Sequence, residues 1–205
     1  MYPGERFNAW THLIGALAAL TGAIWLIVAA AASGDLLKTA SVTVYGLTLV
    51  MLYSISTLYH SVRGRLKRVL RKLDHLSIYL LIAGSYTPFA LVTLRGPWGW
   101  TLFGIDWALA AIGIAQELWI GRRTRLFSLL IYVAMGWLVL IAMGPLAAAL
   151  PAPGLWWLVA GGALYTAGIG FFLFDEKVRH FHGIWHLFVL AGSACQFVSI
   201  LRYVG

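Results

Sequence analysis

The sequence predicts an all-α integral membrane protein, a single bundle of seven transmembrane helices, on three observations. First, 61% of the 205 residues are hydrophobic and only 11% are charged. A soluble domain carries about a quarter charged residues, so this chain cannot cover a globular surface with charge. Second, the apolar residues gather in runs of about 20 residues, the length that crosses a bilayer core. Third, Lys and Arg concentrate in alternate connections between these runs.

Seven apolar runs follow one another along the chain. The first, residues 13–32, is longer than the ~7–15-residue core of a signal peptide, so we expect it to remain as a span. Gly84 and Pro88 are expected to bend the third run. The expected spans are 13–32, 42–60, 75–94, 101–120, 127–146, 155–174 and 183–203, in a single domain of residues 1–205. The breaks between them are Ser33-Gly34-Asp35, the basic stretch 63–72, Arg95-Gly96-Pro97, Gly121-Arg122-Arg123, Pro151-Ala152-Pro153-Gly154 and Asp175-Glu176-Lys177.

The distribution of Lys and Arg predicts the orientation of the bundle. With seven spans, the N-terminus shares a side with the second, fourth and sixth connections, and 12 of the 15 basic residues lie there. Cytoplasmic segments carry such an excess, so we expect a cytoplasmic N-terminus and a C-terminus outside. Topology therefore accounts for the net charge of +8 without nucleic acid. The single cysteine, Cys195, excludes a disulfide within the chain. The basic residues on the N-terminal side are Arg6, Arg63, Arg65, Lys67, Arg68, Arg71, Lys72, Arg122, Arg123, Arg125, Lys177 and Arg179, and those on the other side are Lys38, Arg95 and Arg202.

The histidines of the chain all fall at this same end of the expected bundle. They are His12, His60, His75, His180, His182 and His186. Spacings of four residues place Asn8 with His12, Ser56 with His60, and His182 with His186 on shared helix faces. Asp74 opens the third span at the same depth. Ionisable groups are costly in a membrane bundle and usually mark a functional site, so we predict one here, with His75 and His180 as interfacial residues.

We predict that His60, His182 and His186 are the ligands of a zinc ion, Zn2+. A neutral imidazole offers zinc a ring lone pair, and a catalytic zinc site keeps three protein ligands and one water. Asp74 would hold and deprotonate that water, which zinc brings to a pKa of about 7, or would ligate the ion directly. Ser56, one turn from His60, would hydrogen-bond the water or a ligand ring. Asp74 and Ser56 are therefore the predicted catalytic residues.

The sequence resembles the haemolysin III family, part of the wider progestin and adipoQ receptor group, over essentially the whole chain. The motifs that carry the resemblance are Glu5, Asn8 and His12, then Ser56, His60 and Asp74, and then His182 and His186. The resemblance implies a seven-helix bundle with zinc near the cytoplasmic face, held by the three histidines named above, with Asp74 acting on the zinc water. The short N-terminus is similar to that of the bacterial branch, which implies a multi-pass protein of the bacterial cell (inner) membrane. Glu5, Asn8 and His12 are assigned only to support of the ligands.

The resemblance implies three different functions. A proposed superfamily with alkaline ceramidases implies hydrolysis of a lipid amide and a role in membrane-lipid homeostasis. The receptor members imply a non-enzymatic receptor or sensor with a structural zinc. The haemolysin name implies a cytolytic or pore-forming protein, although the spans contain few ionisable residues that would line a pathway. We expect a hydrolase with membrane lipid as its substrate, or else a receptor with membrane lipid as its ligand. Neither the identity of that lipid nor the oligomeric state follows from the sequence.

Overall fold

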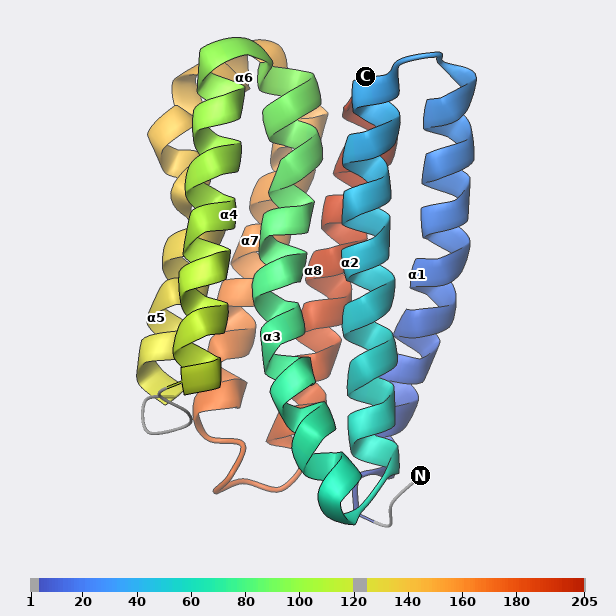
Figure 1. Cartoon of the computed structure of the whole chain (residues 1–205), viewed down its shortest axis with the longest axis vertical. Coiled ribbons are helices and arrows are strands. Elements are labelled where there is room, and N and C mark those ends of the chain that lie inside the picture. The colour runs from blue at the N-terminus through green and yellow to red at the C-terminus, as the bar shows by residue number, and fades with distance from the viewer. Residues whose placement is uncertain (1–3, 120–124, 205) are drawn as a thin grey trace.

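The computed structural model describes residues 4–119 and 125–204, and consecutive long helices run in opposite directions between two ends of a bundle (Figure 1). Among the described residues, seven helical segments are long and apolar enough to cross a membrane, so the predicted seven-span bundle is confirmed. The elements are α1 (Arg6–Ala32), α2 (Leu36–Ser61), α3 (Gly64–Pro88), the π-helix η1 (Phe89–Leu94), α4 (Gly96–Trp119), α5 (Arg125–Gly136), the 3-10 helix η3 (Leu138–Ala142), α6 (Met143–Ala149), α7 (Ala152–Leu173) and α8 (Phe181–Tyr203).

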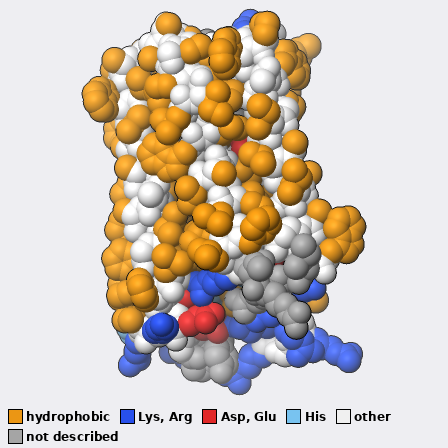
Figure 2. Space-filling view, turned by 90° about the vertical axis from the view of Figure 1, so that its left-hand side faces the viewer, with side chains coloured by type: hydrophobic (Ala, Val, Ile, Leu, Met, Phe, Trp, Pro, Cys, Tyr) orange, Lys and Arg blue, Asp and Glu red, His pale blue; other side chains and the backbone are white. Residues whose placement is uncertain are grey.

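The two ends of the bundle differ in charge. The N-terminus lies at one end, which we call the N-terminal end, and the C-terminus lies at the other (Figure 1). On the face drawn in Figure 2, hydrophobic side chains cover the wall of the bundle, and Lys and Arg side chains gather at the N-terminal end. Large apolar side chains such as Trp25, Trp119 and Trp156 are exposed. An apolar wall with one basic end suits a protein whose sides face lipid.

The helices extend beyond the predicted spans at several ends. The basic stretch 63–72, which we expected to be a connection, is helical from Gly64 onward. Its Arg, Lys and Leu residues favour helix. Gly64 begins the helix with a positive φ of +68°, a backbone conformation that residues with a Cβ rarely adopt. Residue 120 of the fourth span and the predicted break at 121–123 lie outside the described residues.

Two of the spanning segments are irregular near the C-terminal half of their length. The α3 helix becomes a π-helix directly after Pro88, one of the two residues at which we predicted a bend. The fifth segment is interrupted by η3, so the predicted span 127–146 consists of three short helices. The Tyr86 hydroxyl donates to the Gly136 carbonyl at 2.8 Å and accepts from the Val139 amide at 2.9 Å. A side chain from α3 therefore satisfies backbone groups that the break in the fifth segment frees.

The last helix, α8, packs against both α7 and α1 and so joins the two ends of the chain. Ser193 connects α8 to two other helices. The Tyr53 hydroxyl of α2 donates to its Oγ at 2.8 Å. The Tyr165 hydroxyl of α7 lies 2.8 Å from the same oxygen. These contacts hold the middle of α8 against α2 and α7.

A close approach between α4 and η1 provides a test of the packing. A Cβ added at Gly99 would lie 2.1 Å from the backbone carbonyl oxygen of Ala90. Backbone cannot yield as a flexible side chain does, so we expect Gly99→Ala to destabilise the protein by about 1–3 kcal/mol. Thermal unfolding of the purified protein in detergent should show a lower Tm. Gly104→Ala, in the same helix, is the matched control, because a Cβ there meets nothing within 4 Å. Equal Tm values for the two variants would contradict the packing described.

Candidate metal centre

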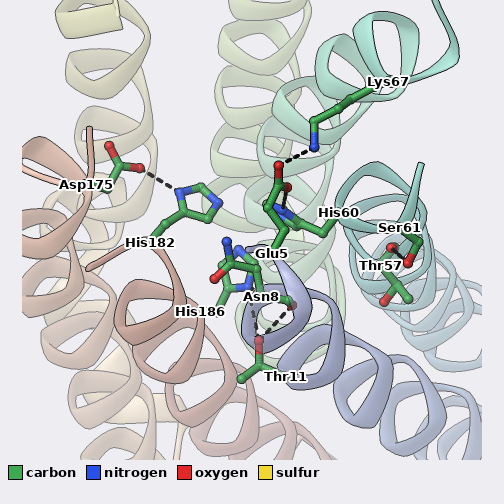
Figure 3. A network of polar contacts seen from close by, with 10 residues as sticks. All are labelled: Glu5, Asn8, Thr11, Thr57, His60, Ser61, Lys67, Asp175, His182 and His186. Carbon is green, nitrogen blue, oxygen red and sulfur yellow. Dashed lines mark hydrogen bonds and ion pairs between the residues drawn. The ribbon is translucent and has the colours of Figure 1, made fainter. Parts of the chain in front are cut away.

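Three histidines converge at the N-terminal end of the bundle. His60 is in the last turn of α2, and His182 and His186 lie one turn apart at the start of α8. One ring nitrogen from each lies within 4.8 Å of those from the other two. The ring centroid of His60 is 5.0 Å from those of both His182 and His186, which are 4.6 Å from each other (Figure 3). The structure therefore brings together the three predicted ligands.

Each of these rings is held by its Nδ1 atom. His60 Nδ1 donates to a carboxylate oxygen of Glu5 at 2.7 Å, and His182 Nδ1 donates to Asp175 at 2.6 Å (Figure 3). His186 Nδ1 lies 3.2 Å from both the Asn8 carbonyl oxygen and Thr11 Oγ1. A hydrogen bond from Nδ1 fixes the tautomer and leaves the Nε2 lone pair available to a metal.

The two carboxylates that hold His60 and His182 are each paired with a cation. Lys67 Nζ lies 2.5 Å from Glu5, and an Arg125 guanidinium nitrogen lies 2.7 Å from Asp175. Burial raises the pKa of Glu5, but hydrogen bonds from His60 and Lys67 outweigh it and lower the pKa to about 2. The same balance lowers the pKa of Asp175, where burial is outweighed by hydrogen bonds from His182 and Arg125. Both carboxylates are thus ionised at neutral pH and accept the Nδ1–H bonds.

The free nitrogens of the cluster fit a metal ion. Among the described residues, Nε2 of His60, His182 and His186 is buried without a hydrogen-bond partner. Leaving a buried polar atom unpaired costs about 1–3 kcal/mol, so three such atoms at one place call for a shared partner. A cation accepts lone pairs from all three, and three imidazoles with carboxylate or carbonyl support are a donor set that zinc takes. The group could therefore hold a metal ion.

The Glu5 contact gives the first motif a testable role. We expect Glu5→Gln to raise the zinc dissociation constant about tenfold, because the variant loses the charge that orients and polarises the His60 ring. Zinc competition against a chromogenic chelator would measure this. Glu176→Gln is the matched control, because Glu176 pairs with Arg125 at the same end of the bundle and is 72% exposed. Unchanged zinc affinity in Glu5→Gln would show that this carboxylate does not support the metal site.

Asp74 and Ser56 lie where two cavities approach each other. A polar cavity of about 280 Å³ at the N-terminal end is lined by Glu5, His60, Asp74 and His182, among others. An apolar cavity of about 140 Å³ inside the bundle is lined by Ser56 and again by Asp74. Both side chains are buried. Asp74 is outside the group of atoms that lie within 4.8 Å of one another. Its predicted role at the metal stays a prediction.

The other histidines differ from one another in their surroundings. His12 is buried, and its ring stacks on that of His186 with centroids 3.5 Å apart. His75, which we expected to be interfacial, is half-buried and lies 3.1 Å from Glu117 of α4. His180 precedes α8 in a left-handed conformation, at φ +70°, and is exposed. The structure thus places His12 directly against a predicted ligand.

Sequence reasoning missed several residues that support the site. Asp175 was taken only as part of a break, yet it holds His182. Thr11 was not among the predicted site residues, yet it contacts His186. Lys67 and Arg125 were assigned to topology alone. The one available signal was an acidic residue seven positions before His182, in a connection on the same side of the membrane.

The comparisons with known proteins agree with this architecture. The chain is 48% identical to Hemolysin-3 of Bacillus cereus over 98% of its own length and 91% of that protein. It is 43% identical to a Hemolysin-3 homolog of Bacillus subtilis over 97% and 93% of the two chains. A more distant relative is the human monocyte to macrophage differentiation factor, 29% identical over 96% and 83%. Residues 2–197 match the family described as Haemolysin-III related. The chain therefore belongs to the haemolysin III family, as a multi-pass membrane protein with a histidine cluster between its second and last spans.

Proposed function

We propose that this protein is a zinc-dependent hydrolase that cleaves an amide or ester bond of a membrane lipid. One observation carries the proposal: Asp74, a buried carboxyl group, lines both the polar cavity of the histidine cluster and the apolar cavity inside the bundle. A carboxyl group at that place can meet water from one side and a lipid from the other. Ceramide-like lipids, whose amide lies between a long acyl chain and a polar head, have the corresponding chemistry.

The apolar cavity suits an acyl chain. Its walls come from α1, α2, α3, α5, α7 and α8 and include Ile78, Leu81, Leu129, Ile169 and Val189. Ligand sites for apolar molecules are lined in this way, with a few polar groups that fix the reacting end. Here the polar groups nearest the histidine cluster are Ser56, Asp74 and His12. The acyl chain would therefore lie in the bundle with its carbonyl group toward the N-terminal end.

The chain's own residues then have defined parts in the reaction. When bound, zinc supplies polarisation of the carbonyl group and lowers the pKa of a water to about 7. His60, His182 and His186 would hold the ion. Asp74 takes a proton from the attacking water, whose oxygen adds to the carbonyl carbon, and passes that proton to the leaving nitrogen or oxygen as its bond to carbon breaks. Ser56 donates a hydrogen bond to the water. The products are a fatty acid and an amine or alcohol.

We also propose where the protein and its site lie in the cell. With the basic end of the bundle in the cytoplasm, the N-terminus would be inside and the C-terminus outside. For a bacterial protein this places the site at the cytoplasmic face of the cell (inner) membrane. Hydrolysis of membrane lipid at that face would contribute to membrane-lipid homeostasis.

The proposal is tested by assaying the purified, zinc-loaded protein in lipid nanodiscs against a panel of ceramides, N-acyl amines and acyl esters. Mass spectrometry would measure release of the free fatty acid, and the zinc content of the same sample would be measured in parallel. We expect release from at least one lipid class. A fully loaded protein that releases no fatty acid from any lipid would rule out the hydrolase. It would leave a receptor or sensor, in which zinc joins spans, as the function of this site.

A further inference from the structure

His12 is a buried imidazole without a polar partner among the described residues. His12 is 2% exposed, and among the described residues neither of its ring nitrogens has a hydrogen-bond partner. In contrast, His60, His75, His182 and His186 each have a partner on Nδ1. An imidazole buried in a membrane bundle with both nitrogens unpaired is costly, so a polar group must meet it in the working protein.

The His12 ring is held in place by its aromatic neighbours. It stacks on His186 with an interplanar angle of 12°, and the edge of the Tyr53 ring packs on it at 88° with centroids 5.0 Å apart. His186 is itself held by Asn8 and Thr11, which belong to the same helix as His12. A ring confined between two others presents its nitrogens in a fixed direction, as a substrate-contacting group requires.

His12 lies on the wall of the apolar cavity. His12 lines this cavity together with Ser56 and Asp74. His12 is not part of the three-histidine group that could hold a metal. A buried imidazole with unpaired nitrogens on the wall of a largely apolar cavity fits a ligand with a long hydrocarbon chain and one oxygen-bearing group.

We propose that His12 is a further catalytic residue, which donates a hydrogen bond from its ring N–H to the carbonyl oxygen of the acyl substrate. This inference rests on the proposed function, because it takes the apolar cavity as the place of the acyl chain. A neutral imidazole has one N–H donor in either tautomer. As water adds to the carbonyl carbon, negative charge grows on this oxygen and a donor aimed at it stabilises that charge. His12 thereby fixes which carbonyl group along the lipid faces Asp74.

Ligand binding tests this role separately from hydrolysis. Scintillation proximity with radiolabelled oleamide would measure the affinity of the zinc-loaded protein, and octadecene, which has the chain but no oxygen, would serve as the second probe. His12→Phe keeps a ring against His186 and Tyr53 but has no donor. We expect it to keep its zinc and its Tm, to bind oleamide about tenfold more weakly, and to bind octadecene as the wild type does. His12→Gln, which retains an N–H donor, should recover part of the oleamide affinity.

Tyr53→Phe is the matched control, because the Tyr53 hydroxyl faces Ser193 and Tyr53 is not among the cavity-lining residues. Equal oleamide affinity in His12→Phe and wild type would overturn the inference, as would loss of zinc from His12→Phe or absence of oleamide binding in the wild type. Oleamide binding that depends on His12, in a protein that hydrolyses no lipid, would instead overturn the proposed hydrolase and leave the His12 contact standing.

Discussion

Replacing His186 or His182 with alanine is expected to abolish zinc binding. Each substitution removes one of three ring nitrogens that lie within 4.8 Å of one another, and two imidazoles hold zinc far more weakly than three. Mass spectrometry of purified protein should find about one zinc per chain in the wild type and almost none in either variant. His186→Ala should also lower the Tm, since its ring is fully buried and stacks on His12.

The two variants differ in the burial of the residue replaced, so the prediction can be tested even if one variant does not fold. His182 is about a quarter exposed, so His182→Ala should fold normally even where His186→Ala does not. His75→Ala is the matched control, because His75 lies at the same end of the bundle but contacts Glu117 rather than the cluster. Its zinc content should equal that of the wild type. Zinc retained in folded His182→Ala would mean that the metal, if any, is held elsewhere.

Replacing Asp74 with asparagine is expected to abolish hydrolysis while zinc stays bound. Asparagine has the size and shape of aspartate but cannot take a proton from water, so we expect fatty acid release to fall by at least about a hundredfold. The zinc content should stay at the wild-type level because the ligands are the three histidines. Initial rates of fatty acid release in nanodiscs, with zinc measured on the same samples, would check both statements.

Asp106→Asn is the control for this experiment. Asp106 is also buried in the bundle, on α4, but it is absent from the lining of both cavities near the cluster. Its substitution should leave the rate of hydrolysis unchanged. Turnover by Asp74→Asn within about twofold of the wild type would remove Asp74 from the reaction. Loss of zinc from Asp74→Asn would mean that Asp74 ligates the ion directly, and a large drop in Tm after chelation of the wild type would then favour a structural zinc.

The amino-acid sequence was sufficient to predict the spans and the meeting of the histidines. Bilayer thickness sets the length of each apolar run, and topology sets which connections are basic. Both features can therefore be recognised in short stretches of sequence. The convergence of His60 with His182 and His186 followed from topology as well, because each lies at a span end on one side. The extent of α3 was not predicted, because the Arg and Lys residues of 63–72 suit both a connection and a helix.

The partners of the histidines depend on tertiary packing, so short stretches of sequence do not predict them. Glu5 contacts His60 across 55 positions of sequence, and Lys67 reaches Glu5 across 62. Asp175 lies in a connection whose path determines whether it faces His182 or solvent. The apolar cavity is likewise formed by six helices together, so no single run of residues predicts it. Pairings of this kind require the relative placement of helices, which hydropathy and spacing do not give.

The contact between His186 and Thr11 joins residues 175 positions apart, so the first and last helices complete the same cluster. During synthesis the N-terminal helices enter the membrane before α8 exists, and the early chain offers only His60 of the three nitrogens. The group that could hold a metal ion is therefore complete only after α8 has inserted and packed against α1. A chain that is truncated before residue 182, or whose last helix fails to insert, holds no complete cluster. The complete cluster thus distinguishes a finished molecule from every shorter or misassembled one.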